Sequence, residues 1–199
     1  MNVGLILIGD ELLSGLRQDK HTVQVREILR QRGLALSWIR IVGDDRGLLM
    51  QTFSETFSAQ DVVFSFGGIG ATPDDITRQA VAAAINVPLI RHPEAVALIE
   101  SQFGEDAYPR RILMSELPAT ATLLPNPVNQ IPGFKIDHHH FVPGFPDMAW
   151  PMVEWALDTY YRHTFDAAPP EEQRWKLKHV VESELVPMME ELLKLFPEV

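Results

Sequence analysis

The chain has 199 residues, which is enough for one medium α/β domain with a small appendage and a sizeable core. Its formal net charge of −10 disfavours nucleic-acid binding through a broad basic face. It contains no cysteine, so disulfides, thiolate nucleophiles and zinc–thiolate sites are excluded. The start of the chain has no basic segment, and its apolar run is too short to span a bilayer, so we expect a cytoplasmic protein that does not enter a membrane.

Two apolar segments near the start are each followed directly by acidic residues. Val3–Ile8 is typical of a buried strand and leads into Gly9–Glu11, and residues 34–42 predict a second strand that leads into Gly43–Asp45. A helix predicted over residues 20–32 separates the two strands. Open α/β sheets bind ligands at the carboxyl ends of their strands, so both clusters are candidate site residues. Ordinary solvated turns explain each cluster equally well when it is taken alone.

The third predicted strand leads into the most informative stretch of the chain. Val62–Phe66 is rich in β-forming residues, and a glycine-rich loop follows it at residues 67–70. Glycine has no Cβ and reaches positive φ at low cost, so a ligand can approach such a backbone closely. Beyond the loop, Thr72 is a natural N-cap, Pro73 fits the first helical position, and Asp75 occupies the acidic position of a capping box. We therefore predict a helix with Thr72 as its N-cap and Pro73 as its first residue.

A strand, a glycine loop and a helix N-terminus in this order bind phosphate-bearing ligands in α/β proteins. The acids Asp74 and Asp75 repel phosphate, so we expect a divalent cation such as Mg²⁺ to bridge them to the ligand. The alternative is that both acids only complement the helix dipole, at ~0.3–1 kcal/mol each. Helix capping needs one acid and no run of glycines, so the pattern favours a binding site.

The alternation of strands and helices over the first half predicts a doubly wound, mainly parallel sheet. In the second half we expect helical segments at residues 93–103 and 110–117 and short strands at residues 134–136 and 141–142. The intervening segment 123–133 is too rich in proline and asparagine for a long regular element.

Three adjacent histidines, His138–His140, lie between the two short strands. A histidine cluster suggests a metal site, but neighbours in a strand or turn point in different directions, and metal-binding pairs come at wider spacing. We therefore interpret the triplet as a solvent-exposed turn. A tight turn at Pro143–Pro146 then leads into a helix predicted over residues 147–162.

A composition of small residues, prolines and charges predicts a boundary after residue 166. We assign residues 1–166 to one domain and residues 167–199 to a linker and a partial α+β extension. The extension is predicted to hold a strand at residues 175–181 and a helix at residues 182–196. The apolar face of this helix must pack on the body of the protein, on a partner chain or on sequence beyond this chain, and we expect a homo-oligomer.

Several short motifs between Val3 and about Phe165 agree in order with one known family. They are GDELLSG at Gly9–Gly15, VGDD at Val42–Asp45, GGIGATPDDIT at Gly67–Thr77, LPNP at Leu124–Pro127, PGF at Pro132–Phe134 and PGFPDM at Pro143–Met148. Each motif alone is weak, but in combination they resemble the molybdopterin-binding (MogA/MoaB-like) fold family. Within that family the chain is most similar to the N-terminal domain of competence/damage-inducible protein A (CinA).

The resemblance implies a three-layer α/β domain with helices on both faces of a mainly parallel sheet. In the family, the site at the strand ends binds a molybdopterin or a nucleotide-like pyrophosphate compound, and CinA-like proteins are associated with metal-dependent hydrolysis of ADP-ribose. The resulting hypothesis gives catalytic roles to Asp45 and Asp75 and metal binding to Asp74 and Asp75. The implied ligand-binding residues are Gly9, Asp10, Glu11, Asp44, Gly67, Gly68, Gly70, Thr72, Thr77, Pro143, Gly144 and Pro146.

Two other functions fit the same motifs. One is a pterin-binding or adenylyltransferase module of molybdenum cofactor biosynthesis, with molybdopterin as the ligand. The other is a diverged binding protein without catalysis. The family pattern usually has threonine at Asp10, asparagine at His21, proline at Ala71 and glycine at Asn129, and these departures bear on the substrate rather than on the fold.

Overall fold

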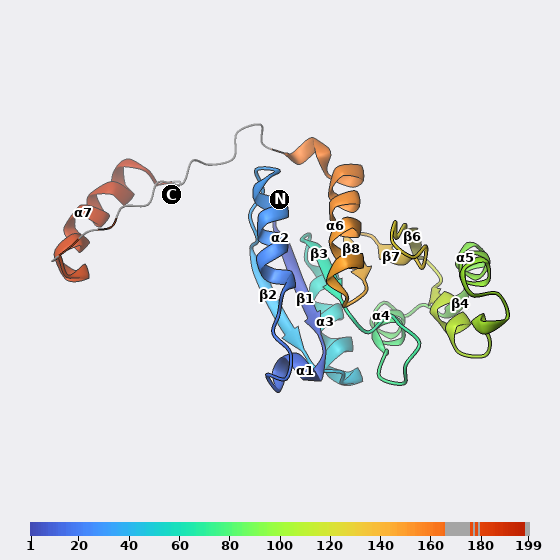
Figure 1. The fold of residues 1–199 in the computed structure, drawn as a ribbon. Coiled ribbons are helices and arrows are strands. Elements are labelled where there is room, and N and C mark those ends of the chain that lie inside the picture. Colours follow the sequence, from blue (N-terminus) through green and yellow to red (C-terminus); the bar gives the residue numbers. More distant parts are fainter. Residues whose placement is uncertain (166–175, 177, 179, 198–199) are drawn as a thin grey trace. The chain divides into compact units, whose positions relative to one another are not determined.

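The computed structural model describes residues 1–165, 176, 178 and 180–197. The chain forms two compact units, Met1–Pro169 and Pro170–Val199. The first unit contains a six-stranded sheet with helices on both of its faces (Figure 1). This arrangement confirms the predicted three-layer α/β architecture.

The central sheet has the strand order β2-β1-β3-β8-β7-β6. The first four strands run parallel to one another, and β7 and β6 continue the sheet in antiparallel pairs. The sheet is therefore mainly parallel, as predicted, and the carboxyl ends of four strands open on one edge. The strands are β1 (Val3–Ile8), β2 (Trp38–Val42), β3 (Val62–Phe66), β6 (Thr122–Leu124), β7 (Gly133–Ile136) and β8 (His139–Val142).

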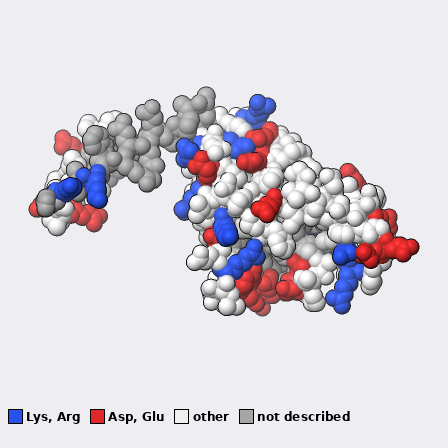
Figure 2. All heavy atoms as spheres, in the orientation of Figure 1, with Lys and Arg blue, Asp and Glu red and all other residues white. Residues whose placement is uncertain are grey.

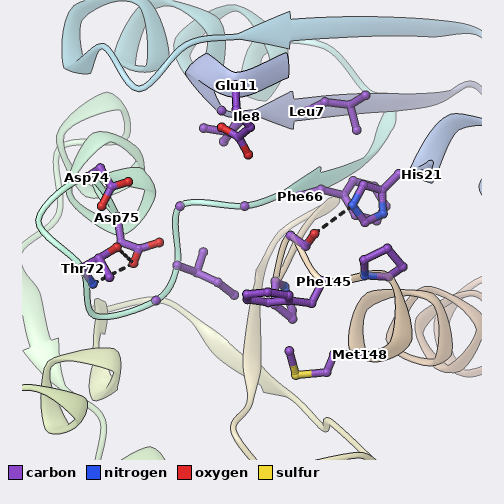
Figure 3. Close-up of a pocket in the computed structure, with 18 of the residues that line it drawn as sticks. Leu7, Ile8, Glu11, His21, Phe66, Thr72, Asp74, Asp75, Phe145 and Met148 are labelled. Carbon is purple, nitrogen blue, oxygen red and sulfur yellow. Dashed lines mark hydrogen bonds between the residues drawn. The ribbon is translucent and has the colours of Figure 1, made fainter. Parts of the chain in front are cut away.

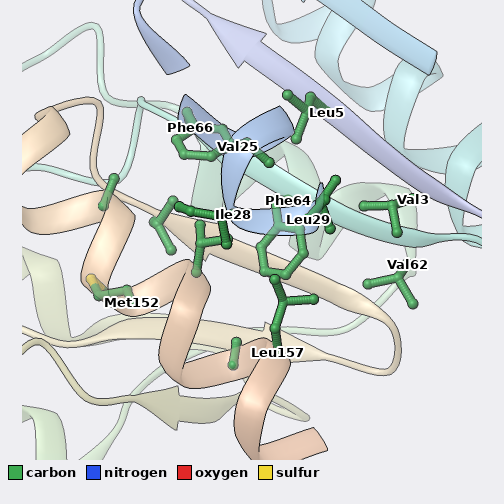
Figure 4. Close-up of a cluster of buried hydrophobic side chains, with 14 of the residues drawn as sticks. Val3, Leu5, Val25, Ile28, Leu29, Val62, Phe64, Phe66, Met152 and Leu157 are labelled. Carbon is green, nitrogen blue, oxygen red and sulfur yellow. The ribbon is translucent and has the colours of Figure 1, made fainter. Parts of the chain in front are cut away.

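Alternate residues of the central strands supply two separate cores. On one face Leu5 and Phe64 pack against α2 and α6 (Figure 4), and on the other face Ile6 packs against α3 and α4. Each fully buried side chain of this size stabilises the fold by roughly 1.5–3 kcal/mol. The helices of the first unit are α1 (Asp10–Leu13), α2 (His21–Arg30), α3 (Arg46–Ser58), α4 (Thr77–Ala84), α5 (Pro93–Phe103) and α6 (Pro146–Tyr160), with 3-10 turns η1 (Gly104–Ala107), η2 (Arg111–Ser115) and η3 (Arg162–Thr164).

A small side arm sits beside the main sheet and has its own core. Its strands β4 (Leu89–Arg91) and β5 (Glu116–Pro118) form an antiparallel pair, and α5 and the two 3-10 turns η1 and η2 pack next to them. The single helix predicted at residues 110–117 was wrong, because η2 ends at Ser115 and the chain then pairs with β4. Strand β4 was not predicted from the sequence, because its three residues are only partly buried or exposed and show no clear strand pattern.

Helix α4 begins at Thr77, four residues later than predicted. The carboxylate of Asp75 does reach back to the Thr72 backbone N–H, at 2.8 Å, as in a capping box. The chain then closes a tight turn, with the Ile76 N–H bonded to the Asp74 carbonyl, and restarts as a helix. The capping chemistry was predicted correctly, but it closes a turn instead of a helix.

Of the histidine triplet, only His138 lies in a solvent-exposed turn as predicted, and the prediction was wrong for the other two. His139 and His140 belong to β8, in the interior of the sheet, and both side chains are buried. Each ring stacks on a phenylalanine of its own face, His139 on Phe57 and His140 on Phe64. Adjacent strand residues point to opposite faces, so the two rings enter opposite cores.

Hydrogen bonds fix which ring nitrogen carries the proton in each of the two buried histidines. His140 Nδ1 donates to the Val63 carbonyl at 3.3 Å. His139 Nε2 lies 2.9 Å from the Thr56 hydroxyl, whose own proton goes to the Thr52 carbonyl, so the histidine is the donor. Burial lowers the pKa of each histidine to about 3.

The second unit contains helix α7 (Glu182–Leu195), which confirms the predicted terminal helix. Its large apolar side chains, among them Met188 and Leu193, are exposed. The strand expected at residues 175–181 falls partly outside the described residues, and positions 176, 178, 180 and 181 are not in a strand. Among the described residues, no helix combines the length and the apolar character that a membrane span requires.

Candidate functional site

A cavity of about 490 Å³ opens at the carboxyl ends of the parallel strands. The segments that follow β1, β3 and β8 form its rim, and α5 and η2 of the side arm contribute Phe103 and Met114. Figure 2 shows acidic side chains gathered at the end of the domain where α1 lies. The sheet topology therefore brings together segments that are more than 100 residues apart in the sequence.

The loop after β3 requires glycine at two positions. Gly67 has φ 99° and Gly68 has φ 68°, which side chains rarely adopt. A Cβ on Gly67 would lie 2.7 Å from the Ile8 carbonyl oxygen, and a Cβ on Gly68 would overlap the Thr77 hydroxyl. The glycines thus let the loop lie directly against β1 and the start of α4.

Three carbonyls of this loop turn toward the start of α4. The Gly67 carbonyl accepts from the Thr77 hydroxyl at 3.1 Å, and the Gly68 carbonyl accepts from the Thr77 N–H at 3.0 Å. The Gly70 carbonyl accepts from Arg78 Nη2 at 2.6 Å. Every carbonyl in this set is therefore occupied on the protein side of the loop.

The amides that follow these carbonyls are free. In a trans peptide the N–H points opposite to the preceding C=O, so the N–H groups of Gly68, Ile69 and Ala71 turn away from α4. No acceptor in the described part of the chain bonds to any of the three, and all three residues line the cavity. Such a set of unpaired amides at the edge of a sheet binds anions.

Two acids flank the loop at the edge of the cavity. Asp75 Oδ2 accepts from the Thr72 N–H at 2.8 Å and from its hydroxyl at 2.5 Å, which fixes the carboxylate. Asp74 is exposed beside it (Figure 3). A Cβ on Gly70 would collide with the Asp75 carboxylate, so the third glycine is required by this close packing.

A second acidic group comes from the ends of β1 and β2. The Asp10 N–H donates to Asp44 Oδ2 and the Asp44 N–H donates to Asp10 Oδ1, both at 3.1 Å. Partial burial raises the pKa of Asp44, and the nearby charges of Asp10, Glu11 and Asp74 raise it further. Glu11 also pairs with Arg17 at 3.5 Å.

Most of the predicted ligand-binding residues line the cavity, and three predicted site residues do not. Asp45 Oδ1 caps helix α3 by accepting from the Leu48 N–H at 2.8 Å. Thr77 is buried behind the glycine loop. Asp10 bonds to Asp44, which lines the cavity, but Asp10 itself does not line it. The predicted residues that line the cavity are Gly9, Glu11, Asp44, Gly67, Gly68, Gly70, Thr72, Asp74, Asp75, Pro143, Gly144 and Pro146.

The acids suit a cation that arrives with a ligand better than a preformed metal centre. Within the described residues, no group of three Asp, Glu or His side chains could hold a metal ion. Mg²⁺ commonly uses one or two carboxylates and takes its other ligands from substrate phosphates and water. Asp74 and Asp75, adjacent to the free amides, match that requirement.

On the side of the cavity opposite these acids, the sequence analysis predicted the turn Pro143–Pro146 but did not predict the side chain that packs against it. The His21 ring lies 4.4 Å from Phe66, and its Nε2 donates to the Gly144 carbonyl at 3.2 Å, which also accepts from Arg17 (Figure 3). Burial lowers the pKa of His21, so the ring is neutral at pH 7. The sequence offered one indication of this contact: His21 stands where the family pattern usually has asparagine. The apolar residues that line the cavity include Phe66, Ile69, Phe103, Met114, Ile131 and Met148.

Comparison with known proteins places the chain in one family. Residues 4–163 match the model of a probable molybdopterin binding domain. A CinA-like protein from Syntrophotalea carbinolica is 30% identical over 89% of this chain, and one from Desulforapulum autotrophicum is 31% identical over 82%. The chain spans 45% and 40% of the lengths of these two relatives.

Solved structures agree with this assignment. A CinA protein from Thermoplasma acidophilum, described as having unknown function, has a TM-score of 0.72 at 26% identity and covers 79% of this chain and 96% of its own. The molybdopterin biosynthesis enzyme MoaB from Thermus thermophilus has a TM-score of 0.51 at 18% identity, with 80% and 91% covered, and shows the fold alone. The chain belongs to the molybdopterin-binding domain family and has CinA-like proteins among its relatives.

Proposed function

We propose that the protein binds a nucleotide pyrophosphate such as ADP-ribose in this cavity and hydrolyses it with a divalent cation. The observation that carries the proposal is the set of free loop amides at Gly68, Ile69 and Ala71, directly beside the carboxylates of Asp74 and Asp75. Amides of this kind bind phosphoryl oxygens, and adjacent carboxylates suit Mg²⁺.

The two halves of the cavity suit the two parts of such a ligand. The loop amides bind the pyrophosphate and stabilise the charge that develops on it during hydrolysis. The apolar side, with Phe66 and Met148, buries a flat ring. A divalent cation, when bound, adds positive charge at the phosphoryl oxygens. Asp44, whose pKa is raised, is the carboxylate best suited to take a proton from the attacking water.

The test is metal-dependent release of AMP from ADP-ribose by the full chain. Asp75→Asn removes one carboxylate charge and weakens the fixed bond to Thr72, so we expect turnover to fall about 100-fold or more. Glu55→Gln is the matched control, because Glu55 pairs with Arg40 on the surface. Full activity of Asp75→Asn at unchanged thermal stability would overturn the assignment.

A pterin ligand is the second candidate. The apolar side of the cavity accepts a pterin ring as well as an adenine ring, and the chain belongs to the molybdopterin-binding domain family. Calorimetry with ADP-ribose, AMP and a molybdopterin precursor, each with and without Mg²⁺, separates the two. Tight binding of the precursor alone would favour a role in molybdenum cofactor biosynthesis.

A further inference from the structure

A buried arginine lies directly behind the glycine loop. Arg78, the second residue of α4, is only 3% exposed. Its Nη2 donates to the Gly70 carbonyl at 2.6 Å, and its Nη1 donates to the carbonyls of Leu113 and Glu116. The guanidinium therefore joins the glycine loop to η2 and β5 of the side arm.

Among the residues that the structure describes, the positive charge of Arg78 has no direct counterion. The ion pairs of the described residues do not include it, and Asp75 and Glu116 act on it only from a greater distance. Its Nε is also buried without a partner. Arginine stays protonated even when burial lowers its pKa. Buried charges are normally paired, because an uncompensated charge in a low dielectric is costly.

The cavity lies where a counterion would be expected. Gly70 O accepts from Arg78, and the next peptide N–H, that of Ala71, points the other way. One peptide plane thus separates the guanidinium from an amide that faces the cavity. An anion bound to the loop amides would meet the positive charge of Arg78 across that plane.

We propose that Arg78 is a positioning residue for anionic ligands: it holds the Gly70 carbonyl away from the cavity and supplies the charge behind the loop amides. This rests on the proposed function, since the ligand must carry phosphate. Arg78 does not touch the ligand. It acts through the loop and through the potential at the cavity edge.

The experiment measures ADP-ribose affinity by calorimetry with Mg²⁺ in the full chain. Arg78→Gln keeps donors for the carbonyls and removes the charge, so we expect affinity to fall at least about tenfold. Arg78→Lys keeps the charge and loses the planar fork, so affinity should stay within about threefold of the wild type although thermal stability falls.

Two further variants keep the result interpretable. Leu29→Ala destabilises the fold, because Leu29 is buried in α2 and does not line the cavity, and it should leave affinity unchanged. Glu116→Gln removes an acid that acts on Arg78 and should tighten binding about twofold, which tests the charge even if Arg78→Gln does not fold.

The outcomes separate the two proposals. If the wild type binds neither ADP-ribose nor inorganic pyrophosphate, the proposed function fails, and this inference fails with it. If the wild type binds but the glutamine and lysine variants of Arg78 weaken equally, or Arg78→Gln binds normally, only the role of Arg78 is overturned. Unchanged affinity in Glu116→Gln would also contradict it.

Discussion

The polar groups that follow β3 and those within β8 differ in whether the protein itself supplies their hydrogen-bond partners. At the carboxyl end of β3, the loop amides after Gly67 face the cavity without partners in the described part of the chain. Within β8, His139 and His140 are buried and stacked on aromatic rings; His139 is hydrogen-bonded through Nε2, and His140 through both ring nitrogens, to the Val63 carbonyl and the Tyr161 hydroxyl. Polar groups left free at a strand end are available to a ligand, whereas those within the sheet are committed to the fold.

The largest expected effect concerns the histidines and pH. Both have a pKa of about 3 in the folded chain and an ordinary pKa of 6.5, so the unfolded chain binds more protons between these values. Their contribution to stability is complete above pH 6.5 and is lost as pH falls toward 3. The slope is on the order of 1.4 kcal/mol per pH unit for each histidine.

Urea unfolding between pH 7 and 4 checks this prediction. His139→Phe should reduce the pH slope of the unfolding free energy by about half of the histidine contribution. His163→Gln, a substitution at an exposed histidine, is the control. A slope in His139→Phe equal to that of the wild type would mean that the buried ring is not what makes the fold sensitive to acid.

A smaller effect is expected at the loop. Gly67→Ala places a Cβ 2.7 Å from the Ile8 carbonyl at φ 99°, so it should cost about 2–3 kcal/mol of stability and weaken ADP-ribose binding at least about tenfold. Gly15→Ala also has positive φ, 75°, but meets nothing within 4 Å. It should cost about 1–2 kcal/mol and leave binding intact. Equal losses of affinity in both variants would show that the loop geometry is not specific to the site.

The smallest effect separates Asp45 from the cavity. Asp45→Ala removes the N-cap of α3 and should cost about 1 kcal/mol in thermal unfolding, with AMP release within about twofold of the wild type. Asp44→Ala should instead reduce AMP release, because Asp44 lines the cavity. Loss of turnover in Asp45→Ala at near-normal stability would restore the catalytic role that the sequence motif implied.

Local chemistry was readable from the sequence because it depends on neighbours along the chain. The strand at Val62–Phe66, the glycines that follow it and the bond from Thr72 to Asp75 were all predicted from residue types and spacing. The ordered motifs also predicted the fold and the family. The start of α4 was misplaced because the Gly68 carbonyl, a contact nine residues away, fixes the amide of Thr77.

Burial and partners far apart in the sequence decided the features that the sequence analysis did not predict. Asp44 and Asp45 are adjacent and chemically identical, and only the packing of β1 against β2 directs one to the cavity and leaves the other to cap a helix. The sequence pattern of His139 and His140 indicates a turn, but in the structure both belong to β8, which lies between β3 and β7. The sequence pattern of Arg78 indicates an ordinary helix residue, but in the structure its side chain donates to carbonyls of the side arm. The sequence by itself determined the fold, the family and the loop chemistry, because these depend on local pattern and composition. Only the tertiary structure decided which polar groups are buried, paired or left free, because solvent exposure depends on residues far apart in the chain.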